Sequence, residues 1–239
     1  MQVTKFIKKI LIIPLLVAGC ATPSVNPADF QEAADKLSCS SPAEFLVTFI
    51  ALWSAQTHPN GIPEDPHFSP LIGGTHNMAV QFWAPGATAS PGMENMAENG
   101  RVSPLDSEIQ TAMENGNAGV IIRGSGIGPS PGETSIDFNI TEEFRYVTLV
   151  SMIAPSPDWF VGVHDLDLCG EDGNWMNHLM VELFPYDAGT DSGVTFTSAD
   201  ADTLPQEPIR LLNEDPFLVN GDFPPMGIFS FTRVEGASI

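Results

Sequence analysis

The sequence predicts a mainly β protein, an antiparallel β-sandwich with one or two short helices in its connections. The chain contains 21 glycines and 21 prolines in 239 residues, a composition that favours many turns and short strands over a helical bundle. Short segments rich in β-branched and aromatic residues recur along the chain, separated by Gly, Pro, Asn and Asp clusters such as Pro59-Asn60-Gly61. Short strands between such turns are typical of a sandwich or barrel.

The β-rich segments are spread over most of the chain. In order, the predicted strands are Phe45–Trp53, Met78–Trp83, Gly119–Arg123, Ile136–Ile140, Phe144–Ile153, Trp159–Val163, Leu179–Phe184 and Gly227–Val234. No internal repeat, low-complexity tract or obvious linker follows residue 40. We therefore expect residues 39–239 to form one domain.

One amphipathic helix is predicted after Ser103, which has the chemistry of an N-cap, with Pro104 as the first helical residue. The apolar residues that share one face of this helix are Leu105, Ile109, Ala112 and Met113. Gly116 is a C-terminal stop signal. A shorter helix is predicted over Met93–Asn99.

The chain is strongly acidic, with 30 Asp and Glu against 9 Lys and Arg and a formal net charge of −21. Nucleic acid is a poor partner for such a protein because its phosphates would be repelled. The charge favours cations and basic surfaces as partners, and it carries no information about the fold.

The first residues have the pattern of an export signal. A basic start with Lys5, Lys8 and Lys9 precedes the apolar run Ile10–Val17, which is too short to span a bilayer as a helix. The run ends in Val17-Ala18-Gly19-Cys20, which resembles a bacterial lipobox. An ordinary secretory signal with an incidental cysteine is the alternative.

The lipobox predicts that Cys20 becomes the diacylated N-terminus of the mature protein. Residues 1–19 are then a lipoprotein signal peptide, and residues 20–38 are the lipidated N-terminus and tether. We expect the protein to be exported and anchored to the bacterial outer membrane or cell surface by lipid only. Ala21 after the cysteine favours the outer membrane.

Two further cysteines, Cys39 and Cys169, remain once Cys20 is assigned to the lipid. Export places them in an oxidising compartment, so a disulfide is expected, with two free buried thiols as the alternative. A bridge closing a loop of about 130 residues is worth about 4–5 kcal/mol in the loop-entropy description.

Familiar enzyme motifs are lacking in the sequence. Gly124–Gly128 does not have the spacing of a phosphate-binding loop and is not followed by a helix pattern. The first three histidines, His58, His67 and His76, are spaced by nine, which is not zinc-ligand spacing. No nucleophile elbow is found either, and we predict a non-enzymatic protein.

Acidic residues on two loops are more informative. Asp158 follows the rigid turn Pro155–Pro157, and Asp187 and Asp191 stand four apart on a glycine-containing loop after a predicted strand. Hard oxygen donors grouped on loops are the ligands that Ca²⁺ prefers. Solvated turn residues are one alternative. A carboxylate pair for glycoside hydrolysis is the other.

These segments resemble a known family. Pro155–Val163, Asp167–Cys169 and Pro185–Gly193 are strongly similar to the spondin N-terminal domain of F-spondin and mindin. Shorter similarities are His67–His76, Ala97–Gly100 and Pro205–Ile209. The resemblance covers about residues 39–234.

The resemblance implies a C2-like antiparallel β-sandwich with bound Ca²⁺. The family's ligating aspartates fall on Asp158, Asp187 and Asp191. A further acidic ligand of some members falls on Asn139, with Asp137 nearby. The family's disulfide falls on Cys39 and Cys169.

The sequence as a whole predicts a calcium-binding, non-enzymatic binding or adhesion module held at the cell surface by lipid. Its partner would be a cell-surface or matrix-like ligand, either protein or glycan. Two alternatives stay open: a secreted hydrolase that uses the three aspartates, or a purely structural envelope lipoprotein.

Overall fold

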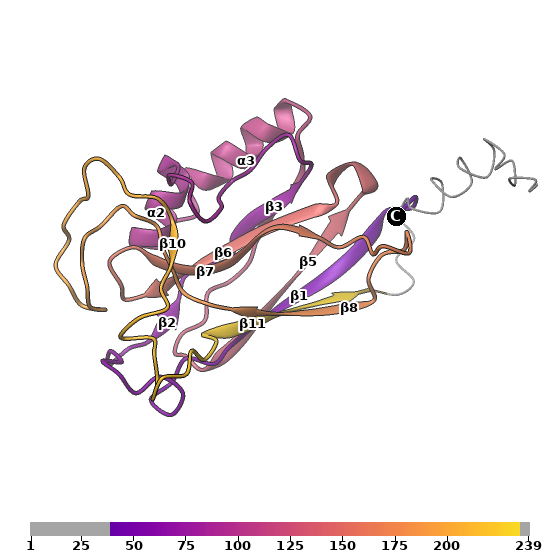
Figure 1. Cartoon of the computed structure of the whole chain (residues 1–239). Helices are drawn as coiled ribbons and strands as arrows, with labels where there is room; N and C mark the ends of the chain where they lie inside the picture. The colour runs from indigo at the N-terminus through magenta and orange to yellow at the C-terminus, as the bar shows by residue number, and fades with distance from the viewer. Residues whose placement is uncertain (1–38, 235–239) are drawn as a thin grey trace, which may run out of the picture. The chain divides into compact units, whose positions relative to one another are not determined.

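The computed structural model describes residues 39–234, which form two antiparallel sheets packed face to face (Figure 1). The first sheet has four strands in the order β5 (Gly132–Ile140), β1 (Ala43–Ala51), β11 (Gly227–Arg233) and β8 (His178–Leu183). The second has seven: β10 (Arg210–Leu211), β9 (Tyr186–Asp187), β7 (Trp159–Asp167), β6 (Tyr146–Ala154), β3 (Ile72–His76) and β4 (Ala118–Arg123), with β2 (His67–Phe68) paired to β6. The predicted antiparallel sandwich is confirmed.

Strand β1 lies at the centre of the first sheet and supplies much of the core. It pairs along its whole length with β5 on one side, and with β11 from Phe45 to Ala51 on the other. Every second residue is buried, as the period of a strand requires. The Phe49 ring contacts Phe68 of the second sheet at 4.8 Å and Phe229 of β11 at 5.2 Å between centroids. The contact with Phe68 bridges the two sheets, while the contact with Phe229 packs two strands of the first sheet together.

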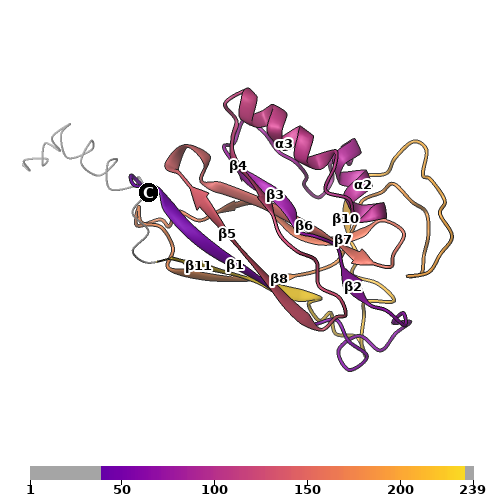
Figure 2. The same cartoon turned by 180° about the vertical axis from the view of Figure 1, so that it is seen from behind.

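Two helices cover the outer face of the second sheet, α2 (Pro91–Asn99) and α3 (Leu105–Glu114), as Figures 1 and 2 show. A second apolar cluster lies under them and includes Met93, Met96 and Ile109. Ser90 caps α2 by accepting a hydrogen bond from the N–H of Met93, and its hydroxyl donates to Glu108 on α3. This link fixes the two helices to each other.

Both predicted helices are present, but the predicted cap of the longer one is not. Its N-cap residue is Pro104, with no side-chain capping bond, so Ser103 does not cap α3. A short 3-10 helix, η1 (Glu142–Phe144), follows β5. Among the residues that the structure describes, no helix has both the length and the apolar character to cross a membrane.

The prediction of a strand at Met78–Trp83 is wrong. The segment forms turns, and Asn77 Oδ1 accepts the N–H of Ala79 in an Asx-type turn. Phe82 and Trp83 are nevertheless buried, and the Trp83 ring packs on Phe160 at 4.9 Å. The apolar residues that suggested a strand therefore fill the second core from a loop.

Strand β3 was not predicted because its sequence, Ile72–His76, contains two adjacent glycines. A Cβ at Gly73 would stand 2.0 Å from the carbonyl oxygen of Thr148, and one at Gly74 would stand 2.7 Å from that of Val120. β3 lies between β6 and β4. The glycines are thus required because the backbone of the neighbouring strands approaches closely. Glycine has a low strand propensity, so this tertiary requirement makes the segment hard to predict as a strand.

The predicted disulfide is confirmed, and Cys39 and Cys169 are bonded with their Cα atoms 6.0 Å apart. The bond ties the chain just before β1 to the segment just after β7, and so joins the two sheets at one end of the sandwich. Cys20 and the tether 20–38 lie outside the described residues.

Replacing both bonded cysteines, Cys39→Ser with Cys169→Ser, should lower the free energy of unfolding by about 3–5 kcal/mol, because the unfolded chain gains the freedom of a 130-residue loop. Urea unfolding of the oxidised protein and the double variant measures this. Equal midpoints would show that the bridge does not stabilise the domain.

Candidate metal site of buried aspartates

Two loops at one end of the second sheet carry the predicted metal ligands. Asp158 stands directly before β7, and Asp187 is the last residue of β9. β9 pairs with β7 so that Trp159 lies opposite Asp187, and the N–H of Ala188 donates to the carbonyl oxygen of Asp158 at 3.1 Å. The strand pairing therefore makes Asp158 and Asp187 neighbours.

Asp158 is fully buried, with 0% of its surface exposed. Its Oδ2 accepts the backbone N–H groups of Thr190 at 2.7 Å and Asp191 at 3.1 Å, and the Thr190 hydroxyl at 3.3 Å. Its Oδ1 is also buried and has no hydrogen-bond partner in the part of the chain that the structure describes. Because an unpaired buried carboxylate oxygen is costly, this atom is where a proton or cation would stabilise the domain most.

Asp187 is partly buried and has partners for both oxygens. Oδ1 accepts the N–H of Gly189 at 2.8 Å, and Oδ2 accepts from the Arg210 guanidinium at 3.1 Å. Gly189 has a φ of +76°, and a Cβ there would stand 2.1 Å from the carbonyl oxygen of Glu207. Only glycine allows the loop to turn back over Asp187 at this point.

Asp191 orders the loop that follows. Its Oδ1 accepts the N–H of Gly193 at 2.6 Å, and its Oδ2 accepts the N–H of Ala201 at 2.7 Å. Only 6% of the residue is exposed. The side chain therefore holds the base of the 191–201 loop closed, while its own backbone N–H binds Asp158.

The pKa values follow from this burial. Burial raises the pKa of Asp158 to about 7, and the charge of nearby Asp187 adds to the effect, while the hydrogen bonds from Thr190 and Asp191 oppose it. Burial also raises the pKa of Asp187, against the N–H of Gly189 and the charge of Arg210. The two carboxylates thus resist being charged together in the absence of a cation.

A further acid, Glu98, joins this region from the end of α2. Its Oε1 is buried without a hydrogen-bond partner in the described chain, and burial raises the pKa of its carboxyl group. It lines a hollow of about 260 Å³ together with Asn99, Ser156, Pro157, Asp191, Ser198, Asp200 and Asp202. Sequence reasoning noted Ala97–Gly100 as a family-like motif but gave Glu98 no role.

Asn139 does not join the three aspartates. It lines a pocket with Cys39 at the disulfide end of the sandwich, and Cys169 follows the C-terminal end of β7. Asp158 precedes the N-terminal end of the same strand, and nine residues of strand span about 30 Å. The family resemblance assigned Asn139 to the metal site, and the fold places it at the other end of the sandwich.

The donor chemistry at the aspartates fits a hard cation. Asp158 and Asp187 are interacting carboxylates. One oxygen of Asp158 is buried without a hydrogen-bond partner among residues 39–234, and the backbone N–H of Asp191 binds the other. Within residues 39–234, no set of three or more His, Cys, Asp or Glu side chains is arranged to hold a metal ion. The arrangement therefore brings two of the predicted ligands together, while the third is bound to backbone N–H groups.

Comparison with known proteins decides the family. The Spondin_N family model matches residues 43–218. This chain belongs to the spondin N-terminal domain family. Rat spondin-1 is 33% identical over 197 residues, which cover 80% of this chain and 24% of the relative.

Rat spondin-2 is 34% identical over 171 residues, covering 70% of this chain and 52% of the relative. Human spondin-2 is 34% identical over 176 residues, covering 72% and 53%. The chain thus spans between about a quarter and a half of the length of these spondins.

The raised pKa of Asp158 predicts a pH dependence in the chelated protein. The folded pKa, about 7, lies above the unfolded value, so the folded state binds more protons in between, and stability falls as pH rises toward 7. Asp158→Asn removes this effect. Between pH 5 and 7 in EDTA, wild type should lose on the order of 2 kcal/mol relative to the variant.

Urea unfolding of both proteins at each pH measures the difference, and comparison within the pair cancels the titration of other carboxylates. Parallel pH profiles for wild type and Asp158→Asn would contradict the assignment of this pKa to the buried carboxyl group.

Proposed function

We propose that this spondin-family chain is a calcium-stabilised, non-enzymatic binding or adhesion module, held at the cell surface by lipid on Cys20. The observation that supports the calcium most strongly is the unpaired, buried Oδ1 of Asp158 beside Asp187. A divalent cation would remove both the desolvation cost and the mutual repulsion at this point.

Asp158, Asp187 and Asp191 are the residues that would hold the ion. Each is anchored by backbone N–H groups of Thr190, Asp191, Gly189, Gly193 or Ala201, which fixes the carboxylates on their loops. When bound, Ca²⁺ supplies charge neutralisation and cross-links the two loops. The preformed hydrogen bonds position the carboxylates and lower the entropic cost of binding.

A hydrolase that uses the same carboxylates is the weaker candidate. Its supporting observation is the raised pKa of Asp158, which is a property of a general acid. A glycosidase, however, needs two carboxylates that flank an accessible bond, and Asp158 has none of its surface exposed. Burial of this group favours a structural ion over turnover.

The surface supports a partner with basic groups, or an anionic partner bridged by cations. The described residues contain no lysine and five arginines. Three of these, Arg123, Arg145 and Arg210, are in ion pairs with acidic side chains, namely Asp106, Asp167, Asp187 and Glu214. The remaining surface is predominantly acidic. Cell-surface or matrix-like proteins and glycans are the partner classes that we propose, and nucleic acid is not.

Calcium should raise the Tm of the chelated protein. At a hundredfold excess over Kd the stabilisation is about 2.7 kcal/mol, which corresponds to a Tm increase of about 5–10 °C for a domain of this size. Asp187→Asn should remove most of this increase, while Asp137→Asn, an exposed residue of β5, should retain it. An unchanged Tm on adding Ca²⁺ to the wild-type protein would falsify the calcium proposal.

The same proteins test the binding role. Labelled mature domain should bind to intact cells more strongly in Ca²⁺ than in EDTA, and Asp187→Asn should bind at the EDTA level in both. Equal binding by all proteins in both buffers would favour a structural envelope role. Turnover of a glycan or ester panel that Asp158→Asn abolishes would favour the hydrolase.

Lipid anchoring is tested on the full chain. Wild type expressed in a bacterium should incorporate a clickable fatty acid and sediment with membranes, and Cys20→Ser should lose both properties. Cys39→Ser with Cys169→Ser is the matched control, because it removes cysteines without touching the lipobox. Labelling that persists in Cys20→Ser would contradict the anchor.

A further inference from the structure

The chain contains one Asn-x-Ser/Thr tripeptide, Asn139-Ile140-Thr141. No other asparagine of the sequence is followed two residues later by serine or threonine. This tripeptide is the acceptor pattern for N-linked glycans in exported proteins. The pattern alone is common by chance, so its value depends on where the fold puts it.

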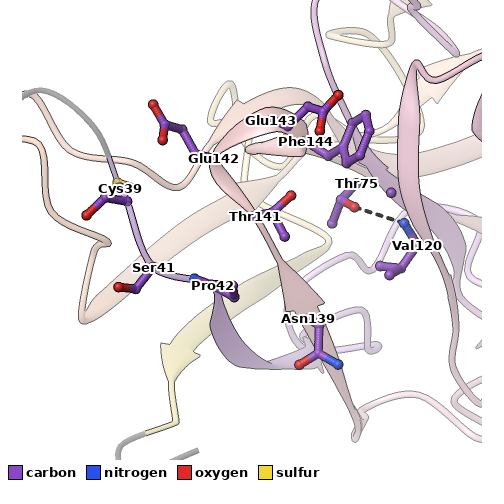
Figure 3. A pocket seen from close by; sticks show the side chains of 12 residues that line it. Cys39, Ser41, Pro42, Thr75, Val120, Asn139, Thr141, Glu142, Glu143 and Phe144 are labelled. Carbon is purple, nitrogen blue, oxygen red and sulfur yellow. Dashed lines mark hydrogen bonds between the residues drawn. The ribbon is translucent and has the colours of Figure 1, made fainter. Parts of the chain in front are cut away.

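The fold exposes the acceptor side chain. Asn139 is the second-last residue of β5, and its neighbours Phe138 and Ile140 are buried, so the alternation of the strand turns Asn139 outward. Among the strands that the structure describes, β5 pairs only with β1 and so lies at the edge of its sheet, with Glu44 opposite Asn139. The amide therefore projects from the rim of the sheet, as Figure 3 shows.

Within residues 39–234, neither polar side chain of the tripeptide is engaged by the groups around it. No hydrogen bond joins the Asn139 amide to the other residues that line its pocket (Figure 3). Thr141 is the N-cap residue of η1, a place where a threonine hydroxyl usually caps, yet it makes no capping bond. The amide and the hydroxyl are both available to an enzyme without unfolding the core.

The surroundings leave room for a large substituent. Asn139 and Thr141 line an open pocket of about 690 Å³ with Cys39, Pro42, Glu142 and Phe144 (Figure 3). The disulfide at this same end fits an oxidising compartment, which is where N-linked glycans are added. The open pocket, the available Asn139 amide and the oxidising compartment are thus all consistent with glycosylation at this position.

We propose that Asn139 is an N-glycosylation site. A membrane-bound oligosaccharyltransferase would use a polyprenyl-diphosphate-linked glycan as donor. A bond forms between Asn139 Nδ2 and the anomeric carbon, the bond from that carbon to the diphosphate oxygen breaks, and polyprenyl diphosphate leaves. The amide gives up one proton to a base of the transferase, and nothing is oxidised or reduced.

The glycan would cover a vulnerable edge. The outer side of β5 presents backbone groups without a strand partner in its sheet, and such edges promote pairing between molecules. A bulky hydrophilic substituent at Asn139 blocks that approach. The site lies at the opposite end of β7 from Asp158, so it does not depend on the calcium proposal.

Peptide mapping of the full chain, purified from the cells that naturally make it, tests this proposal. Trypsin cuts after Arg123 and Arg145, so Asn139 falls in the peptide Gly124–Arg145. We expect this peptide to carry a hexose- or hexosamine-containing mass increment, located on Asn139 by fragmentation. Recovery of only the unmodified peptide would overturn the proposal.

Matched variants separate this site from O-linked sugars on the serines and threonines of the same peptide. Asn139→Gln and Thr141→Val should abolish the increment, and Thr141→Ser, which preserves the acceptor pattern, should retain it. A Tm equal to wild type verifies that each variant is folded. An increment that survives in folded Asn139→Gln would show that the sugar is elsewhere and refute the proposal.

Discussion

The packing of β1 against the second sheet is the constraint on which the rest of the domain depends. Its inward side chains, Phe45, Val47 and Phe49, have none of their surface exposed, and both neighbouring strands take their register from it. A one-residue slip would move this apolar set to solvent, so the register is strongly specified. The four-stranded sheet therefore offers a fixed platform on which the second sheet is positioned.

The second sheet positions the residues of the candidate metal site. The pairing of β7 with the two-residue strand β9 places Asp158 under the loop that begins at Asp187. Backbone N–H groups of Thr190 and Asp191 then donate to one oxygen of Asp158, while the other is buried without a hydrogen-bond partner in the described part of the chain. Natural domains seldom keep an unpaired buried carboxylate oxygen without a proton or an ion. The strain of this arrangement is the physical basis of the calcium proposal.

The two ends of the sandwich differ in chemistry. One end holds the aspartates and Glu98, where burial works against charge. The other is closed by the Cys39–Cys169 bond and carries the exposed acceptor Asn139 beside an open pocket. The length of β7 separates the two ends, so the described residues at one end do not contact those at the other. Mutations at the two ends should therefore have independent effects. The proposed ion binding and the proposed glycosylation can therefore be tested independently of each other.

The sequence by itself determined the sandwich class, most strands and both helices, because alternation, turn residues and apolar spacing are local signals. It also indicated Cys39 with Cys169 and the aspartate loops. Only the tertiary structure decided that Ile72–His76 is a strand and Met78–Trp83 is not. The glycines of β3 are required because the backbone of the neighbouring strands leaves no room for a Cβ atom. The tertiary structure likewise brought Glu98 to the aspartates and separated Asn139 from them, because proximity between distant segments is set by strand order and helix packing, which no local pattern encodes.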